Sequence, residues 1–394
     1  MTTETERQVY LDYSATTPVK EEVLAEMLPY FTSSFGNPSS LYTVGQKSKN
    51  AISRAREQVA ALIGAEPTEV FFTSSGTEAD NWAVIETAMW KRGKGRHIIT
   101  TAIEHHALLH SCEYLEKEGF DVTYLHVDKD GFIDLDELKK QVRDDTTLIS
   151  IMFANNEIGS IQPVAEIAEI AKARGVLFHT DAVQALGNVP IDVKALGVDM
   201  LSVSAHKIYG PKGVGALYIR KGVNLPTHIH GGGQESKKRA GTENLTGIVG
   251  FGKAAELSGQ NLEHHAKTLL SLRTYFLERV QAEIPDIRIN GSLENRLPGN
   301  LNITFKYIEG EAILLLLDMN GIAVSTGSAC SSASLTPSHV LDAIGVPVEE
   351  IHGSIRFTIG DFTTKDDLDY TVEKLKAAVE KLRKISSVSK DSGF

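Results

Sequence analysis

Cysteines and long apolar runs are both scarce in this sequence. Its 394 residues include two cysteines, Cys112 and Cys330, and neither belongs to a paired-spacing pattern. A disulfide scaffold is therefore not expected, and free thiols in a reducing compartment are the simpler interpretation. The longest apolar run, residues 312–317, is far shorter than the roughly 20 residues that a membrane helix needs. We therefore expect a soluble protein with no membrane partner.

An excess of positive charge is also absent. The formal net charge is −11, so a general attraction to nucleic acid or to an anionic membrane is not expected. The first seven residues are polar and acidic, with neither the apolar core of a signal peptide nor an arginine-rich presequence. Together these absences predict a cytoplasmic protein that does not bind nucleic acid directly.

Short apolar strands alternate with helical segments over the first two thirds of the chain, which predicts an α/β fold with a mostly parallel sheet. The predicted strands lie at residues 70–73, 97–101, 122–127, 148–153, 176–179, 200–203 and 215–219, the last of them a returning strand. A long helix is expected from about residue 247 to 284, followed by a smaller α+β unit. A chain of this length exceeds what one hydrophobic core usually serves, so we predict two domains.

Residues 202–215 place one lysine at the end of a predicted strand, before a turn rich in glycine and proline. Beside buried apolar surface, the amine of Lys207 would be less readily charged and could attack a carbonyl carbon. It would then form a Schiff base. The alternative is a lysine whose ammonium reaches out of the strand end into water. Partners elsewhere in the chain must decide between the two.

Polar side chains follow four other predicted strands, and in parallel sheets ligands bind at these carboxyl ends. Ser75, Gly76 and Thr77 open a helix after the first strand, which suits a phosphate group, although Ser75 with Glu78 could simply cap that helix. The later strand ends carry His105, Asn156, Asp181 and Gln184. Pyridoxal phosphate requires a phosphate site, a carboxylate for its ring nitrogen and a lysine for its aldehyde. Asp181 and Lys207 would take the last two roles.

Metal ligation is not expected. The histidine pairs at residues 105–106 and 228–230 have no thiolate or carboxylate at ligand spacing. We predict no metal site.

Eight motifs in one order resemble the cysteine desulfurases of the NifS/IscS type, which are pyridoxal-phosphate enzymes of the class V aminotransferase family. The motifs are Tyr-Leu-Asp-Tyr-Ser-Ala-Thr-Thr-Pro, Gly-Asn-Pro-Ser-Ser, Ser-Gly-Thr-Glu, Asn-Asn-Glu-Ile-Gly, His-Thr-Asp-Ala-Val-Gln, Ser-Ala-His-Lys, Arg-Ala-Gly-Thr-Glu-Asn and Gly-Ser-Ala-Cys. They span nearly the whole chain. One departure is Leu41-Tyr42, in a stretch where the family commonly carries histidine.

The resemblance implies the fold-type I, aspartate-aminotransferase-like architecture, with a seven-stranded sheet in the large domain. It implies a large cofactor-binding domain at residues 16–258 and a small domain made of residues 1–15 and 259–394. It also implies a homodimer, with active sites at the subunit interface. The implied reaction converts L-cysteine to L-alanine and leaves the sulfur on the enzyme as a persulfide. An iron-sulfur scaffold or another sulfur acceptor, for example in tRNA thiolation, would then receive it.

The resemblance also implies a role for each matching residue. Lys207 would bond to the cofactor aldehyde, Asp181 would pair with the ring nitrogen and His105 would stack on the ring. Gln184 and Asn156 would contact the ring hydroxyl or the substrate, and Arg356 would grip the substrate carboxylate. The implied phosphate ligands are Ser75, Gly76, Thr77, Ser204 and His206, with Thr242 from the other subunit.

Cys330 lies in a run of small residues, 325–334, which predicts a loop at about 323–335 that could present a thiol. The resemblance makes this cysteine the nucleophile that takes the sulfur. Cys112 follows two leucines on a predicted helix and fits a small buried apolar residue better. A selenocysteine lyase or another aminotransferase-fold enzyme would share Lys207 and Asp181, although an aminotransferase needs no thiol. A non-catalytic sulfur-relay or scaffold protein would not need Lys207, Asp181, His105, Arg356 and Cys330 together.

Overall fold

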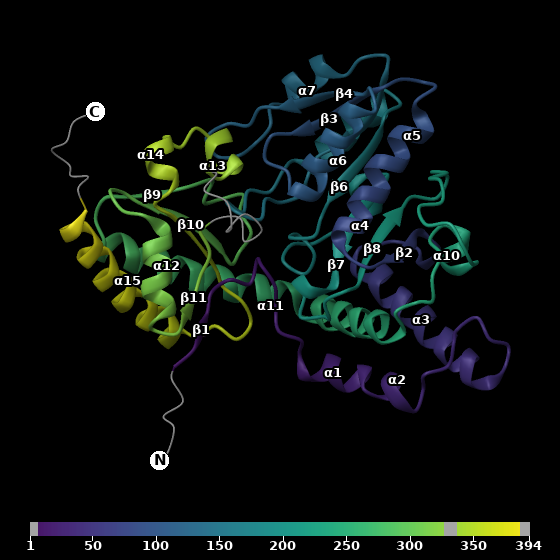
Figure 1. The fold of residues 1–394 in the computed structure, drawn as a ribbon, viewed down its shortest axis with the longest axis horizontal. Coiled ribbons are helices and arrows are strands. Elements are labelled where there is room, and N and C mark those ends of the chain that lie inside the picture. Colours follow the sequence, from purple (N-terminus) through teal and green to yellow (C-terminus); the bar gives the residue numbers. More distant parts are fainter. Residues whose placement is uncertain (1–6, 327–336, 387–394) are drawn as a thin grey trace.

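The computed structural model describes residues 7–326 and 337–386 (Figure 1). Its centre is a seven-stranded sheet with the strand order β2-β8-β7-β6-β5-β3-β4, in which β8 alone runs antiparallel to its neighbours. The strands are β2 (Val70–Thr73), β3 (His97–Thr101), β4 (Asp121–Leu125), β5 (Thr146–Ser150), β6 (Leu177–Asp181), β7 (Met200–Ser204) and β8 (Gly215–Ile219). The predicted α/β fold, its mostly parallel sheet and its returning strand are confirmed.

Helices cover both faces of this sheet because its strands are apolar on both sides. Neighbouring residues show this: Phe71 and Met200 belong to one core cluster, and Phe72 and Leu201 to another. One face is covered mainly by α1 (Glu21–Met27), α3 (Thr43–Leu62), α8 (Val164–Ala173) and the first half of α11 (Leu245–Glu283). The other is covered by α4 (Gly76–Asn81), its continuation Trp82–Glu86, α5 (Thr87–Lys91) and α6 (His106–Lys117). Shorter helices lie at the edges: α2 (Pro29–Thr32), α7 (Leu135–Gln141), α9 (Val193–Leu196) and α10 (Gln234–Lys237).

Two strands end earlier in the structure than the sequence predicts. We predicted strands at 122–127 and 148–153, and the structure has β4 at Asp121–Leu125 and β5 at Thr146–Ser150. Ile151, Met152 and Phe153 are buried although they lie beyond the strand. Apolar residues that pack under a loop cannot be distinguished from strand residues by their hydrophobicity alone.

The long helix α11 connects two hydrophobic cores. Phe251 and Ala255, in its first half, pack in the core of the large sheet, whereas Phe276 and Val280 pack in a second core. In Figure 1 this helix runs from beneath the large sheet towards the smaller α+β unit. Our predicted boundary at 258/259 falls inside α11, and the division into two domains stays a prediction.

The second core is built on a three-stranded antiparallel sheet, in which β10 (Asn300–Phe305) lies between β9 (Ile287–Ile289) and β12 (Ser354–Thr358). The N-terminal strand β1 (Val9–Tyr10) pairs in parallel with β11 (Ile322–Ala323). The helices of this unit are α12 (Gly310–Asp318), α13 (His339–Ala343), α14 (Val348–Ile351) and α15 (Lys365–Ile385). Within the described part of the chain, no helix is long and apolar enough to cross a membrane.

Candidate active site

The carboxyl ends of β6 and β7 lie side by side and carry the two residues that the sequence assigns to the cofactor ring. Asp181 is the last residue of β6, and it pairs in register with Ser202 of β7. The chain leaves β7 through a single 3₁₀ turn, Ala205–Lys207. This turn ends in Lys207, so the sheet itself fixes the position of the lysine relative to the carboxylate.

The ammonium of Lys207 is held by backbone carbonyl groups of the N-terminal segment. Its Nζ donates hydrogen bonds to the carbonyl oxygens of Ser14 and Ala15, the latter at 2.8 Å. The side-chain amide of Gln184 donates to the same Ser14 oxygen at 3.0 Å. Lys207 and Gln184, which were predicted separately from two strand ends, are therefore neighbours.

Asp181 is a buried carboxylate with few partners. Its Oδ1 accepts a hydrogen bond from the backbone N–H of Val183 at 2.9 Å. Burial raises the pKa of this carboxyl to about 6, although the Val183 bond and the positive charge of Lys207 oppose the shift. An additional cationic N–H donor beside Asp181 would stabilise its ionised form.

His105 is the N-cap residue of α6 and is half-buried. Its Nδ1 accepts a hydrogen bond from the backbone N–H of Ala107 at 3.1 Å, so the ring caps the helix. Burial, and then the positive charge of Lys207, lower its pKa to about 4. The imidazole is therefore neutral and flat at neutral pH, which suits stacking on an aromatic ring.

The predicted phosphate ligands gather where α4 meets β7. Ser75 caps α4 by accepting from the N–H of Glu78 at 3.1 Å, as the capping alternative requires, and its phosphate role stays a prediction. A side chain at Gly76 would meet Val183 at 2.7 Å. Glycine therefore allows the start of α4 to approach Val183 closely, while buried Ser204 lies at ordinary contact distance.

His206 and Thr77 lie at the edges of this group. The Nδ1 of His206 lies 3.1 Å from the hydroxyl of Thr16, and burial together with Lys207 lowers its pKa to about 4. Thr77 is exposed and shares a surface hollow with His105. Both have side chains that can donate a hydrogen bond to an anion.

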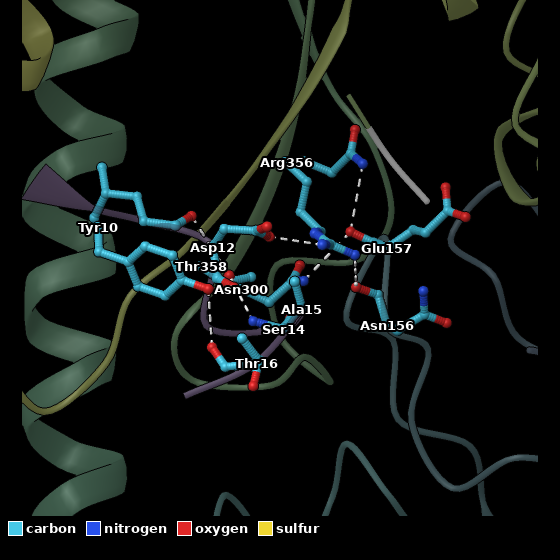
Figure 2. Close-up of polar contacts among 12 residues, drawn as sticks. Tyr10, Asp12, Ser14, Ala15, Thr16, Asn156, Glu157, Asn300, Arg356 and Thr358 are labelled. Carbon is cyan, nitrogen blue, oxygen red and sulfur yellow. Dashed lines mark hydrogen bonds and ion pairs between the residues drawn. The ribbon is translucent and has the colours of Figure 1, made fainter. Parts of the chain in front are cut away.

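Arg356 lies in the middle of β12 and is 1% exposed. Figure 2 shows its guanidinium between Asp12 and the backbone of Asn156. The Nη2 atom lies 2.7 Å from Asp12 Oδ1, and Nη1 donates to the Asn156 carbonyl oxygen at 3.1 Å. The arginine and Asn156 predicted for substrate binding are therefore in contact, and Asp12 is a partner that the sequence prediction missed.

Cys330 lies outside the described residues, but the chain on both sides of residues 327–336 is anchored near the site. Before this segment, Ser325 exchanges backbone hydrogen bonds with Arg356 at 2.6 and 3.2 Å. After it, Ser338 donates to Glu157 at 2.6 Å, and His339 Nε2 lies 2.9 Å from the carbonyl oxygen of Glu104. Glu104 immediately precedes His105.

Thr242 is exposed in the loop before α11 and is the one described candidate that lies in a surface loop away from the strand ends. Three residues earlier, Arg239 binds the carboxylate of Glu78 with two nitrogens, at 2.7 and 3.0 Å. The loop is thereby tied to α4, which carries the predicted phosphate ligands.

A buried polar layer beneath Asp181 was also missed by sequence reasoning. His179 lies between the hydroxyls of Ser150 and Ser202, each at 2.9 Å, and its Nε2 is 3.7 Å from Asp80. Burial, and next the charge of Asp181, raise the pKa of Asp80 well above its ordinary value. The available signal was the polar residues inside otherwise apolar strands, which must find partners within the sheet.

The residues present fit pyridoxal phosphate. Asp181 is a buried carboxylate whose pKa burial raises, and Lys207 ends the turn that follows the adjacent strand. Gly76 begins α4, and the backbone there lies so close to Val183 that a side chain would not fit. No group of three or more His, Cys, Asp or Glu side chains in the ranges 7–326 and 337–386 is arranged to hold a metal ion.

The sequence model of the "Aminotransferase class-V" family matches residues 9–371. The chain is 56% identical over 380 residues to "Cysteine desulfurase IscS" of Dictyoglomus turgidum, covering 96% of each chain. It is 57% identical over 383 residues to the protein of the same name from Methanosarcina thermophila, covering 97% of this chain and 95% of that one.

This chain belongs to the cysteine desulfurases of the class V aminotransferase family. Enzymes of this family depend on pyridoxal phosphate. A solved "NIFS-like protein" shares the fold with a TM-score of 0.90 and 41% identity, covering 95% of this chain and all of its own. The structure titled "SspA in complex with cysteine" has a TM-score of 0.80 and 38% identity, covering 91% of this chain and all of its own. The predicted fold-type I architecture is therefore confirmed.

Proposed function

We propose that this protein is a homodimeric pyridoxal-phosphate enzyme that converts L-cysteine to L-alanine and holds the released sulfur as a persulfide on Cys330. Two relatives that match it at 56 and 57% identity are named cysteine desulfurases, and a similar solved protein was captured with cysteine. The observation that carries the proposal is the juxtaposition of Asp181, Lys207 and His105 beside the Arg356–Asn156 contact.

The bound cofactor would supply an electron-withdrawing ring that labilises bonds at the α-carbon of an amino acid. Asp181 would keep the ring nitrogen protonated, because its buried carboxylate is stabilised by a cationic N–H donor. His105 would stack as a neutral ring. Ser75, Gly76, Thr77, Ser204 and His206 would hold the phosphate, and Gln184 would orient the ring hydroxyl.

Lys207 would bond to the cofactor aldehyde and afterwards move protons. When its amine is not bonded to the cofactor, the carbonyl oxygens of Ser14 and Ala15 can receive it as an ammonium. The two carbonyls keep the proton donor within the site rather than in bulk water. A donor in a fixed place can deliver a proton to the same substrate atom in each turnover.

Arg356 and Asn156 would bind the substrate carboxylate. A guanidinium presents N–H donors in a plane that matches a carboxylate, and its burial on β12 excludes competing water. The substrate's amino end would then point along the crevice towards Lys207, and its sulfur towards the segment that holds Cys330.

The sulfur step is a transfer between two thiol groups. The thiolate of Cys330 would attack the substrate sulfur, so that one S–S bond forms while the C–S bond breaks and its electrons return to the carbon skeleton. Protonation of that carbon gives L-alanine, and the enzyme keeps an S–SH group. The anchoring of Ser325 at Arg356 and of His339 at Glu104 supports this role, because both flanks of the cysteine segment lie at the substrate end.

A homodimer is supported by apolar exposure near the N-terminus. Large apolar side chains that a monomer would leave in water are concentrated between residues 24 and 44: Leu24, Leu28, Phe31, Phe35, Leu41, Tyr42 and Val44. An unusual number of exposed large apolar side chains in one segment of the chain is typical of a protein interface. In the dimer, Thr242 would reach the phosphate of the other subunit.

The persulfide would be passed to an iron-sulfur scaffold or to another sulfur-acceptor protein in the cytoplasm. The IscS names of the relatives support this assignment.

The proposed function is tested by incubating the purified holoenzyme with L-cysteine and measuring released L-alanine together with sulfur bound to Cys330 by intact-protein mass spectrometry. Equal amounts of the two in the first turnover are expected. Pyruvate or free sulfide in place of alanine and bound sulfur would contradict the proposal.

A further inference from the structure

We propose that Asp12 is a positioning residue for Arg356 and that its charge limits how tightly the site holds a carboxylate. This inference rests on the proposed function, because it concerns the arginine that would bind the substrate. Asp12 follows β1 and forms an isolated bridge with Thr358, the last residue of β12. Its carboxylate thus reaches the guanidinium from the N-terminal segment of the chain.

The first observation is that Arg356 would be a buried, uncompensated cation without this acid. The Arg356 side chain is 2% exposed, and Asp12 Oδ1 lies 2.7 Å from Nη2. Removing one partner of a buried ion pair leaves an uncompensated charge, which favours a new arrangement of the neighbouring groups. Asp12 therefore holds the guanidinium in place before a substrate arrives.

The second observation is that Asp12 uses only part of the guanidinium. A guanidinium has five N–H donors. One on Nη2 is directed to Asp12 and one on Nη1 to the Asn156 carbonyl oxygen, while buried Nε has no partner among the described residues. Donors are therefore left for a second carboxylate. When both acids share one cation, each weakens the other's attraction, so Asp12 lowers the affinity for substrate and for the alanine product alike.

The third observation is that Arg356 and Lys207 have a common support. The segment that presents Asp12 continues to Ser14 and Ala15, whose carbonyl oxygens hold Lys207, and the Ser14 N–H donates to the hydroxyl of Thr358 at 2.9 Å. Figure 2 shows Asp12, Ser14, Ala15 and Thr358 on the same side of Arg356. An arginine displaced from Asp12 would bind a carboxylate with the wrong alignment to the lysine.

The test compares Asp12→Asn with the wild-type holoenzyme in two measurements. The dissociation constant of L-alanine is measured from the change that it causes in the cofactor absorption, and kcat is measured with L-cysteine. Removing one charge beside the cation should tighten L-alanine binding about five- to thirtyfold. In the same variant kcat should fall at least about tenfold, because the bound carboxylate is no longer aligned with Lys207. A residue needed only for folding would not tighten binding.

Two further variants decide whether Asp12 acts through Arg356. In an Arg356→Met background, adding Asp12→Asn should leave the L-alanine dissociation constant unchanged. The matched control is Asp199→Asn, which also removes a buried acid from an arginine pair, since Asp199 lies 2.6 Å from Arg220 at the opposite end of the β6 and β7 strands. This control should bind L-alanine as the wild type does.

Weaker or unchanged L-alanine binding in Asp12→Asn, or the same effect in the Arg356→Met background, would overturn the inference. Asp12→Glu provides a second route if the asparagine variant does not fold. It keeps the charge, so L-alanine affinity should stay within about twofold of wild type while kcat falls; tightened binding would count against the inference. A wild-type enzyme that binds L-alanine but releases none from L-cysteine would contradict the proposed function and leave the binding comparison for Asp12 valid.

Discussion

Lys207 and Gln184 share one hydrogen-bond acceptor, the carbonyl oxygen of Ser14. The two donors come from the ends of neighbouring strands of the large sheet, whereas the acceptor comes from the N-terminal segment that pairs with the smaller α+β unit. The lysine is therefore held across the junction of the two units. Movement of the N-terminal segment would change the surroundings of Lys207 without any change in the sheet.

Replacing Lys207 with alanine should abolish the visible absorption band of the purified protein, because Lys207 is the amine that the turn after β7 would present to the cofactor aldehyde. The measurement is an absorption spectrum of the variant after incubation with pyridoxal phosphate and desalting. Lys212→Ala is the matched control, since Lys212 is an exposed lysine five residues later and should keep the band. A band that survives in Lys207→Ala would show that another group binds the cofactor.

Asp181→Asn should increase the stability of the apoprotein at pH 7 and weaken its binding of the cofactor. Folding raises the pKa of Asp181 from 3.8 to about 6, so between these values the folded chain binds more protons than the unfolded chain. Ionised Asp181 therefore lowers the free energy of unfolding as the pH rises through this window, by up to about 3 kcal/mol at pH 7. The asparagine variant lacks this cost, so it should be the more stable apoprotein at pH 7 and lose that advantage near pH 4.

Denaturant unfolding of the two apoproteins at several pH values measures this difference. The same substitution should weaken pyridoxal phosphate binding about 10- to 100-fold, because a charge-assisted hydrogen bond to the ring nitrogen is lost. A variant that binds the cofactor as tightly as wild type would contradict the role of Asp181. An apoprotein difference that is the same at pH 4 and pH 7 would contradict the raised pKa.

Much of this architecture could be predicted from the sequence, for identifiable physical reasons. Strands such as β2, β3 and β8 were placed at their observed bounds because turn residues end their apolar runs. Lys207, Asp181 and His105 were found because each lies at or just after the end of a strand, and the strand ends converge at one edge of a parallel sheet. These residues needed no knowledge of contacts between distant parts of the chain.

The contacts that the sequence did not predict are those between distant segments. Asp12 and Arg356 are 344 residues apart, and no periodic pattern connects them. Glu104 was given no role from the sequence, yet it is fully buried, and burial raises its pKa to about 8. Partners of this kind are set by tertiary packing, which leaves no local signal in the chain.

Replacing Cys330 with serine should abolish alanine release and leave the absorption band intact, because the cofactor site would remain while the acceptor of sulfur is lost. Cys112→Ala is the control. Cys112 is fully buried in an apolar cluster, and burial raises its thiol pKa to about 12, so it cannot supply a thiolate at neutral pH. Alanine formation by Cys330→Ser at the wild-type rate, or its loss in a folded Cys112→Ala protein, would contradict the assignment.

Thr242 provides a test of sites shared between subunits. Thr242→Ala should weaken cofactor binding about tenfold, because one hydrogen bond to a charged phosphate is lost. Mixed dimers of Thr242→Ala and Lys207→Ala subunits separate the two possible arrangements. If Thr242 serves the partner's site, the subunit that keeps Lys207 receives an intact threonine from its partner, so each mixed dimer contains one wild-type site and one doubly altered site. Half of the wild-type cofactor content at wild-type affinity is then expected.

If Thr242 serves its own subunit, the subunit that keeps Lys207 also carries the alanine, and the mixed dimer should bind cofactor only with the weakened affinity. Purifying the mixed dimer with a different tag on each subunit, and titrating it with pyridoxal phosphate, distinguishes these outcomes.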